Sequence, residues 1–209
     1  MCILKLLARG MVLFLVVAPA LAAQKQEEFK LVASDGALGD SFGQSVSIFG
    51  DRALVGAAGD DDSGPNSGAA YLFARAATGG WIEEARLTAA DAGPEHAFGD
   101  AVSLFGERAL VGAPGADEAG FATGAAYVFE RDSTGAWLQA ARLVASDADA
   151  FDHFGISVAL FGDRALLGAF FDEDLGAVSG SAYVFERDAS GIWTQTAKLV
   201  ASDGDMEDG

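Results

Sequence analysis

The stretch Lys30-Leu31-Val32-Ala33-Ser34-Asp35 decides the fold, because close copies of it return three times along the chain. The copies are Arg86-Leu87-Thr88-Ala89-Ala90-Asp91, Arg142-Leu143-Val144-Ala145-Ser146-Asp147 and Lys198-Leu199-Val200-Ala201-Ser202-Asp203. Each begins 56 residues after the one before, with no insertion between them. Self-similarity at a period of this size is typical of a repeat array and not of a conventional single-core domain.

Three further signals keep the same step. A Phe-Gly pair, a tyrosine and a tryptophan occur once in each period, at Phe42-Gly43, Phe98-Gly99, Phe154-Gly155, Tyr71, Tyr127, Tyr183, Trp81, Trp137 and Trp193. Identical spacing at so many apolar and glycine positions predicts one structural unit built three times.

Within a period the pattern predicts four strands. Residues 45–49 alternate in polarity, Gly50-Asp51 supplies a two-residue turn, and residues 52–56 return as the next strand. Glycine at the first central position favours a type II′ turn, whose twist matches the flanking strands. Residues 69–75 and 81–87 complete the set.

Four antiparallel strands per period are typical of a β-propeller blade. The expected fold class is therefore all-β, with three four-stranded blades at about residues 41–89, 97–145 and 153–201 in an incomplete or open propeller. The third strand, Ala126-Tyr127-Val128-Phe129 in the second period, is apolar on both faces. Neighbouring blades that stack face to face would cover both of those faces.

At these residues the sequence resembles the FG-GAP repeat family, the repeat of integrin α-subunit head propellers and of many secreted bacterial proteins. The second copy spells the motif as Phe98-Gly99 followed by Gly112-Ala113-Pro114, whereas the other copies drift to Gly56-Ala57-Ala58 and Gly168-Ala169-Phe170. The resemblance covers residues 28–209. Kelch repeats are the nearest competitor and also form propellers, but their paired glycines are not placed correctly in this chain.

The resemblance implies a calcium loop in some blades, with acidic residues at alternate positions. Two loops have that spacing, with Asp60 and Asp62 in the first copy and Asp172 and Asp174 in the third, but later ligands are missing. The second copy has Ala116 where the first ligand would lie. Calcium prefers six to eight oxygens, so these residues would form a weak site. Solvated acidic turns are the favoured alternative. Asp35, Asp40, Asp147 and Asp152 would add ligands if their loops lie close.

The first residues predict a secretory signal peptide. Lys5 and Arg9 give a positive start, residues 11–17 form a short apolar run, and Ala20-Leu21-Ala22 has the small-x-small pattern of a cleavage site. The run is too short to cross a bilayer of roughly 30 Å as a helix. We expect a signal peptide at residues 1–23, a repeat region at residues 24–209, and a secreted or periplasmic protein without a membrane span.

Composition excludes several classes of function. Cys2 is the only cysteine and lies inside the leader, so the mature chain has no disulfide and no catalytic thiol. The net charge of −18 repels nucleic acid phosphates and anionic lipids. The two histidines, His96 and His153, do not occupy equivalent repeat positions, which favours surface residues over a zinc site. No catalytic residue is expected, because the acidic clusters and glycines recur with the blade.

Three classes of function remain open. The chain binds a protein or glycan through loops at one end of the blades, presents repeats as a structural or surface component, or is the accessory propeller part of a larger secreted hydrolase. Aromatic residues gathered on loops would favour a glycan. The aromatics are expected nearly all at repeat-locked strand positions, which leaves protein binding ahead.

The array is also expected to be open. Propellers need about four to eight blades to close, and three are complete here. A lone outer strand is predicted at residues 28–34 before them, and an unfinished lead-in at residues 203–209 follows. Bare blade faces carrying residues such as Tyr71 or Tyr183 predict self-association, for instance of two chains into a six-bladed ring.

Overall fold

The computed structural model describes residues 29–117, 121–173 and 179–202. Within these ranges every element of regular secondary structure is a β-strand. They are β1 (Val46–Phe49), β2 (Arg52–Ala57), β3 (Ala69–Arg75), β4 (Trp81–Leu87), β5 (Val102–Phe105), β6 (Arg108–Ala113), β7 (Ala125–Arg131), β8 (Trp137–Leu143), β9 (Ser157–Phe161), β10 (Arg164–Ala169), β11 (Ser181–Arg187) and β12 (Trp193–Leu199). The described residues include no helix that is long and apolar enough to cross a membrane.

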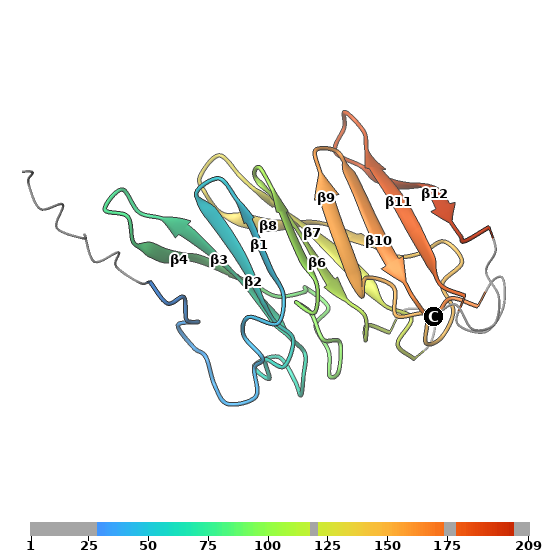
Figure 1. Cartoon of the computed structure of the whole chain (residues 1–209), viewed down its shortest axis with the longest axis horizontal. Coiled ribbons are helices and arrows are strands. Elements are labelled where there is room, and N and C mark those ends of the chain that lie inside the picture. Colours follow the sequence, from blue (N-terminus) through green and yellow to red (C-terminus); the bar gives the residue numbers. More distant parts are fainter. Residues whose placement is uncertain (1–28, 118–120, 174–178, 203–209) are drawn as a thin grey trace, which may run out of the picture.

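The strands form three separate sheets that lie side by side (Figure 1). Blade 1 is the sheet β1-β2-β3-β4, blade 2 is β5-β6-β7-β8, and blade 3 is β9-β10-β11-β12, each antiparallel and in chain order. The predicted all-β fold of three four-stranded blades, open and not closed into a ring, is confirmed. The first strand of blade 2, β5, contacts both β1 and β9, so the three first strands form the inner edge of the array.

Repeated backbone devices shape every blade. Gly50, Gly106 and Gly162 have φ values of 57°, 61° and 60° at the first turn, and the residue after each has a negative φ, as the predicted type II′ turn requires. A β-bulge interrupts the pairing of the third and fourth strands at the same repeat position in all three blades, for example between Leu72 and Phe73. Such a bulge increases the local twist of a sheet.

The hydrophobic core lies between the blades. Leu54 and Leu72 of blade 1 are fully buried in one cluster with Val111 and Tyr127 of blade 2. Blade 2 uses Leu110 in the same way against blade 3, so each blade carries a tyrosine-bearing front face and a leucine-bearing back face. Burying a side chain of this size contributes about 1.5–3 kcal/mol. The two internal contacts are called junction 1–2 and junction 2–3 below.

Glycines allow the blades to approach this closely. A Cβ built on Gly56 would lie 1.9 Å from the carbonyl oxygen of Gly99, and one on Gly112 would lie at the same distance from Gly155. Only a residue without a side chain fits where two backbones meet. The glycines of the second and third Phe-Gly pairs meet Gly56 and Gly112 of the preceding blade, and a Cβ on Gly99 itself would lie 2.3 Å from the carbonyl oxygen of Ala69.

The lone strand predicted at residues 28–34 is wrong for residues 29–34. These residues form no strand, since none of the described strands lies beside them to pair with them. They nevertheless follow the repeat. Leu31 and Ala33 pack on the front face of blade 1, and the Ser34 N–H donates to Glu83, as Ala90 and Ser146 do to Gln139 and Gln195.

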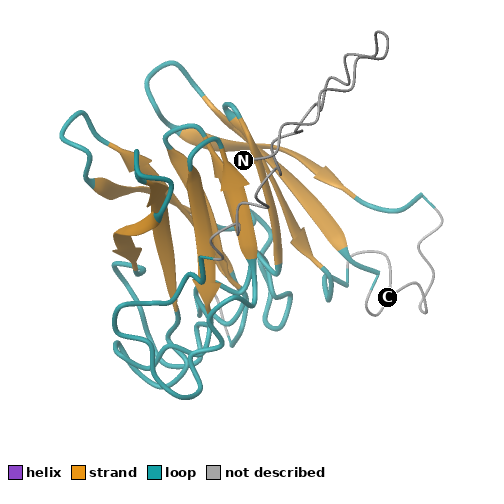
Figure 2. Cartoon of the chain, turned by 60° about the vertical axis from the view of Figure 1, so that its left-hand side comes forward, coloured by secondary structure: helices purple, strands orange, loops and turns teal. Residues whose placement is uncertain are grey.

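The two ends of the blades differ in the length of their connections. Two-residue turns such as Gly50-Asp51 lie at one end, together with the hairpins that join the third and fourth strands. The longer connections, such as residues 58–68 and 88–101, gather at the other end, which we call the loop end (Figure 2). The acidic residues singled out by their spacing lie at this end.

Candidate functional site

The first acidic loop forms a cluster of three carboxylates at the loop end of blade 1. Asp60 and Asp62 follow β2, and Asp35 comes from the N-terminal segment; carboxylate oxygens of all three lie within 4.8 Å of one another. Asp60 is buried, whereas the other two are exposed. The structure thus brings Asp60 and Asp62 together, as their alternate spacing predicts, and adds Asp35.

A positively charged side chain of strand β4 lies within this cluster. The Arg86 guanidinium lies 2.6 Å from Asp60, 3.1 Å from Asp62 and 3.1 Å from Asp35. The Tyr71 hydroxyl donates to the second oxygen of Asp60 at 2.9 Å. A guanidinium presents five donors in a rigid fork, so one arginine can bind several carboxylates at once.

The contacts at Asp60 control its ionisation. Burial of the carboxyl opposes its charge, but hydrogen bonds from Arg86 and Tyr71 outweigh burial and leave the pKa of Asp60 below its usual value. Burial raises the pKa of the Tyr71 hydroxyl, and the neighbouring aspartates raise it further. Asp60 is therefore ionised and Tyr71 protonated at neutral pH, which is the combination that the hydrogen bond between them needs.

Blade 3 repeats the arrangement with lysine in place of arginine. Lys198 on β12 lies 2.9 Å from Asp172 and 2.8 Å from Asp147. The Tyr183 hydroxyl donates to Asp172 at 2.5 Å. Asp174, the other predicted ligand of this loop, lies outside the described residues.

Blade 2 lacks the buried carboxylate. Ala116 is buried at the position of Asp60, and Arg142 instead binds Asp91 at 3.0 Å. The partner aspartates 35, 91 and 147 belong to the repeated stretch that opens the sequence, so they link each blade to the segment before it. Asp40 and Asp152 accept hydrogen bonds from the nearby backbone N–H groups of Ala37 and Asp149.

The donor set has the residue types of a calcium site, but its arrangement does not fit the ion. The carboxylate oxygens at the centre of the cluster bind the Arg86 guanidinium, and one oxygen of Asp60 also accepts the Asp62 N–H. A calcium ion would have to displace that cation before it could gather six oxygens. Calcium at Asp60, Asp62, Asp172 and Asp174 stays a prediction from the sequence, and the geometry favours loops closed by the chain's own cations.

A second feature of the loop end is a group of exposed aromatic rings between blades 2 and 3. The Phe121 and Phe151 rings lie 5.5 Å apart, the Phe170 and Phe171 rings lie 3.9 Å apart, and His153 contacts the second pair. All four phenylalanines are exposed. We call these four residues and His153 the aromatic cluster.

The aromatic cluster breaks the repeat. The other copies have Pro65 and Ala177 at the position of Phe121, Gly39 and Glu95 at that of Phe151, and glycine or other small residues at those of Phe170 and Phe171. The expectation that the aromatics occupy repeat-locked strand positions is therefore wrong for this cluster. Comparing the copies position by position reveals the four residues from the sequence.

Phe151 adopts a left-handed backbone conformation that belongs to the repeat. Its φ is 72°, and its counterparts Gly39 and Glu95 have φ values of 108° and 62°. The backbone therefore does not distinguish this copy from the others. The difference is the exposed ring of Phe151, at a position where the other copies have glycine and glutamate.

Two hollows meet at the aromatic cluster. One, of about 380 Å³, is lined by Ala150, Phe151, His153, Phe171 and Glu173, and it falls within the range of about 300–1,000 Å³ typical of ligand pockets. The other is lined by Asp147, Asp149, Ala150, Asp152, Asp172 and Glu173. Because they share Ala150 and Glu173, the two hollows form one surface that is aromatic on one side and acidic on the other.

Burial shapes the acidic side of this surface. It raises the pKa of Asp152, and the carboxylate of Asp172 adds to the effect. Lys198, which binds Asp172, relieves part of this crowding of like charges, and a cationic group from a partner would relieve more of it. The surface thus offers rings for stacking and carboxylates for ion pairs.

Comparison with known proteins gives one match. The profile of a family described as FG-GAP repeat matches the chain three times, at residues 26–73, 81–129 and 137–185. No curated protein matches the chain. Each matched segment runs from the fourth strand, or its equivalent, through the third strand of the next blade, and so spans the stretch that links one blade to the next.

Proposed function

Because the chain belongs to the FG-GAP repeat family and forms a β-propeller-like repeat domain, we propose that it is a secreted, non-catalytic protein that binds a protein partner through its loop end. The observation that carries the proposal is the aromatic cluster beside the acidic hollow. Exposed apolar patches on a protein surface mark interaction sites. Aromatic anchors dominate the binding energy of many protein interfaces.

The chemistry of the surface favours a basic segment of the partner. Asp149 and Glu173 supply negative charge, and Phe151 and Phe171 lie at the rim of the adjoining hollow. A lysine or arginine side chain can pair with a carboxylate and pack on a ring face at the same time. The net charge of −18 would also steer a basic partner toward the chain.

A glycan is the second candidate, because exposed rings on loops also stack on sugar faces. Against it, the rings are phenylalanines without a polar group of their own, and the polar groups beside them carry like charge. A purely structural role gives no reason for four exposed rings at positions where other copies have smaller residues. The accessory part of a larger hydrolase would use the same surface for binding.

A binding assay with chemically defined probes tests the proposal. The chain without its expected leader is titrated with short lysine- and arginine-rich peptides, with acidic peptides of equal length, and over a glycan array. We expect the basic peptides alone to bind. The variant Phe121→Ser/Phe151→Ser should weaken that binding about tenfold or more, as loss of an aromatic anchor does.

The matched control is Leu38→Ser, which removes an exposed apolar side chain from the loop end of blade 1. It should bind like wild type. Failure of every basic peptide to bind, or equal binding by the Phe121→Ser/Phe151→Ser variant, would contradict the proposal. Binding on the glycan array that the same variant abolishes would establish the second candidate instead.

A further inference from the structure

The outer faces of the array lack contacts that the equivalent residues make at the two internal junctions. At junctions 1–2 and 2–3, Leu54 and Leu110 on the back faces are fully buried. Their counterpart on blade 3, Leu166, is 43% exposed. The back face of blade 3 therefore has the residues of a junction without the cover.

The front face of blade 1 shows the complementary gap. Leu104 on β5 is only 4% exposed, because blade 1 covers it, whereas its counterpart Ile48 on β1 is 68% exposed. The backbone N–H of Leu104 donates to the Ser47 hydroxyl of the preceding blade, and that of Leu160 donates to Ser103. Within the described residues, no preceding blade offers such a hydroxyl to Ile48.

Charged pairs across the junctions follow a fixed rule. The arginine that opens the second strand binds the turn acid of the next blade: Arg52 lies 3.0 Å from Glu107, and Arg108 lies 2.9 Å from Asp163. The next arginine in this series is Arg164, whose side chain is 75% exposed compared with 25% for Arg108.

A second rule runs in the opposite direction. The arginine that ends the third strand binds an acid of the preceding blade: Arg131 lies 2.7 Å from Glu84, and Arg187 lies 2.9 Å from Glu130. Their counterpart on blade 1, Arg75, is 55% exposed compared with 21% for Arg187. The acid that continues this series on blade 3 is Glu186.

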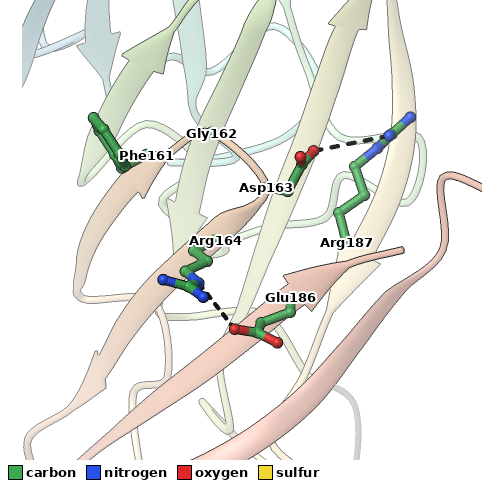
Figure 3. Close-up of a pocket in the computed structure, with 6 residues that line it drawn as sticks. All are labelled: Phe161, Gly162, Asp163, Arg164, Glu186 and Arg187. Atoms are coloured by element: carbon green, nitrogen blue, oxygen red, sulfur yellow. Dashed lines mark hydrogen bonds and ion pairs between the residues drawn. The ribbon is translucent and has the colours of Figure 1, made fainter. Parts of the chain in front are cut away.

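The residues without a partner across a junction keep the within-blade pair that recurs along the array, such as Arg108 with Glu130 at 3.0 Å in blade 2. Arg164 binds Glu186 at 2.9 Å beside the exposed ring of Phe161 (Figure 3), and Arg75 lies 3.9 Å from the turn acid Asp51. Figure 3 also shows Arg187 reaching toward Asp163, within the blade. Blade 3 therefore presents an arginine and a glutamate, and blade 1 presents the aspartate and arginine that complement them.

We propose that the back face of blade 3 binds the front face of blade 1 of a second copy of this chain. In this contact Arg164 pairs with Asp51, as the equivalent residues do at both internal junctions, and Glu186 pairs with Arg75, as Glu130 pairs with Arg187 at junction 2–3. Leu166 and Ile48 are buried together with the faces that carry them. A second copy is the occupant because it offers both the apolar surface and both charges in the order that the internal junctions use.

The contact is head-to-tail, so two copies can satisfy both of their outer faces only by closing a ring. Three blades from each copy would make six, which lies within the propeller range of about four to eight. If the rotation between copies did not close, the same contact would produce open chains of copies. Particle mass distinguishes the two outcomes, and both satisfy the proposed contact.

One element must move for this contact to form. Residues 30–34 lie on blade 1 at the place that residues 198–202 of the preceding copy would take, since the two stretches are copies of one another. Leu31 and Ala33 are only half-buried there. The N-terminal segment thus acts as a tethered competitor for the front face of blade 1.

Sedimentation of the chain without its expected leader, at micromolar concentration and near-physiological salt, tests the contact. We expect a concentration-dependent dimer or larger assembly. The single variants Glu186→Arg and Arg75→Glu should each weaken association about tenfold or more, as charge reversal at a close pair does. The double variant Glu186→Arg/Arg75→Glu should restore it, because the pair is re-formed with its charges exchanged.

Glu95→Arg is the matched control, since it reverses one exposed charge at the loop end, outside the proposed contact and the aromatic cluster, and should leave association unchanged. Melting temperatures of all variants show whether the fold is intact. A chain that stays monomeric at every concentration would overturn the proposal. So would single variants whose defect the double variant does not repair. Because the aromatic cluster contains none of these residues, loss of peptide binding and loss of association remain separate results.

Discussion

Arg86, Arg142 and Lys198 balance acidic groups at equivalent places in the three blades. Within the described residues, Arg86 binds three carboxylates and Lys198 binds two, and Asp174, the counterpart of Asp62, lies outside them. The planar guanidinium supplies several fixed donors and the ammonium is a compact point charge. Charge balance at the loop end is therefore supplied by the fourth strand of each blade.

Removing the guanidinium should make the first loop responsive to calcium. In wild type we expect equal melting temperatures in chelator and in millimolar calcium, because Arg86 occupies the centre of the carboxylate cluster. Arg86→Gln should lose about 2 kcal/mol of stability in chelator, as a buried charge loses its partner. Calcium should then raise its melting temperature, since an ion that binds only the folded state stabilises it.

A calcium-dependent rise in wild type that vanishes in Asp60→Ala/Asp62→Ala would instead establish the calcium site predicted from the sequence. Differential scanning calorimetry of wild type, Arg86→Gln and Asp60→Ala/Asp62→Ala, each in chelator and in millimolar calcium, separates these outcomes.

The lowered pKa of Asp60 makes its contribution to stability depend on pH in one direction. A carboxyl whose folded pKa lies below its unfolded value, near 3.9, stabilises the fold fully above that value. The contribution is lost as pH falls through the lower folded pKa. Urea unfolding should therefore show Asp60→Asn about 2 kcal/mol less stable than wild type at pH 7 and pH 5. The gap should narrow at pH 3. A gap that stays constant or widens in acid would contradict the assignment.

At the level of elements, Gly56 and Gly112 set the distance between blades. A Cβ at either position would meet a backbone carbonyl oxygen at 1.9 Å, and backbone cannot rotate away as a side chain can. Gly56→Ala and Gly112→Ala should each cost about 2–3 kcal/mol, at the upper end of the cost of overpacking. Thermal unfolding measures the effect. Gly36→Ala is the control, since its nearest neighbour would lie at an ordinary 3.4 Å.

The N-terminal segment is the element whose removal should help assembly. Deleting residues 24–33 takes away the half-buried Leu31 and Ala33 and leaves the front face of blade 1 open to a second copy. We expect the dissociation constant measured by sedimentation to fall. Weaker association after the deletion would mean that the segment bridges two copies and does not compete with them.

The sequence predicted the strands almost to the residue, because hairpin glycines and alternating apolar residues act locally. Residues 69–75 and 81–87 agree with β3 and β4. The segment at residues 28–34 was predicted as a strand from its likeness to β4. A strand also needs a hydrogen-bonded neighbouring strand, and the sequence of the segment alone does not say whether one lies beside it. The pairing of Arg86 with Asp60 was missed for a similar reason, since it joins residues 26 positions apart on different elements. The aromatic cluster was not predicted because its residues depart from the repeat, and a pattern shared by all copies does not include them.

Among the described residues of the whole molecule, burial is uneven, because blade 2 has a neighbouring blade on both faces and blades 1 and 3 have one each. Leu110 and Val111 on β6 are both fully buried, while Leu166 on β10 is partly exposed. Repeat arrays open from their less supported ends. In the Glu186→Arg variant, amide hydrogen exchange should therefore be slowest in β6 and β7 and faster in β10 and β11. Equal protection of all three blades would show that the array unfolds as one unit.

The acid that pairs with an arginine across each junction differs: it is Glu84 on β4 at the first junction and Glu130 on β7 at the second. This difference has a consequence for gene rearrangement. Both acids meet an arginine at the same repeat position, Arg131 and Arg187. An in-frame deletion of residues 97–152 would remove one whole period and bring Glu84 opposite Arg187, with Leu54 facing the front of blade 3. Unequal recombination within such a gene can therefore shorten or lengthen the protein by whole blades, and every new boundary inherits a matched partner.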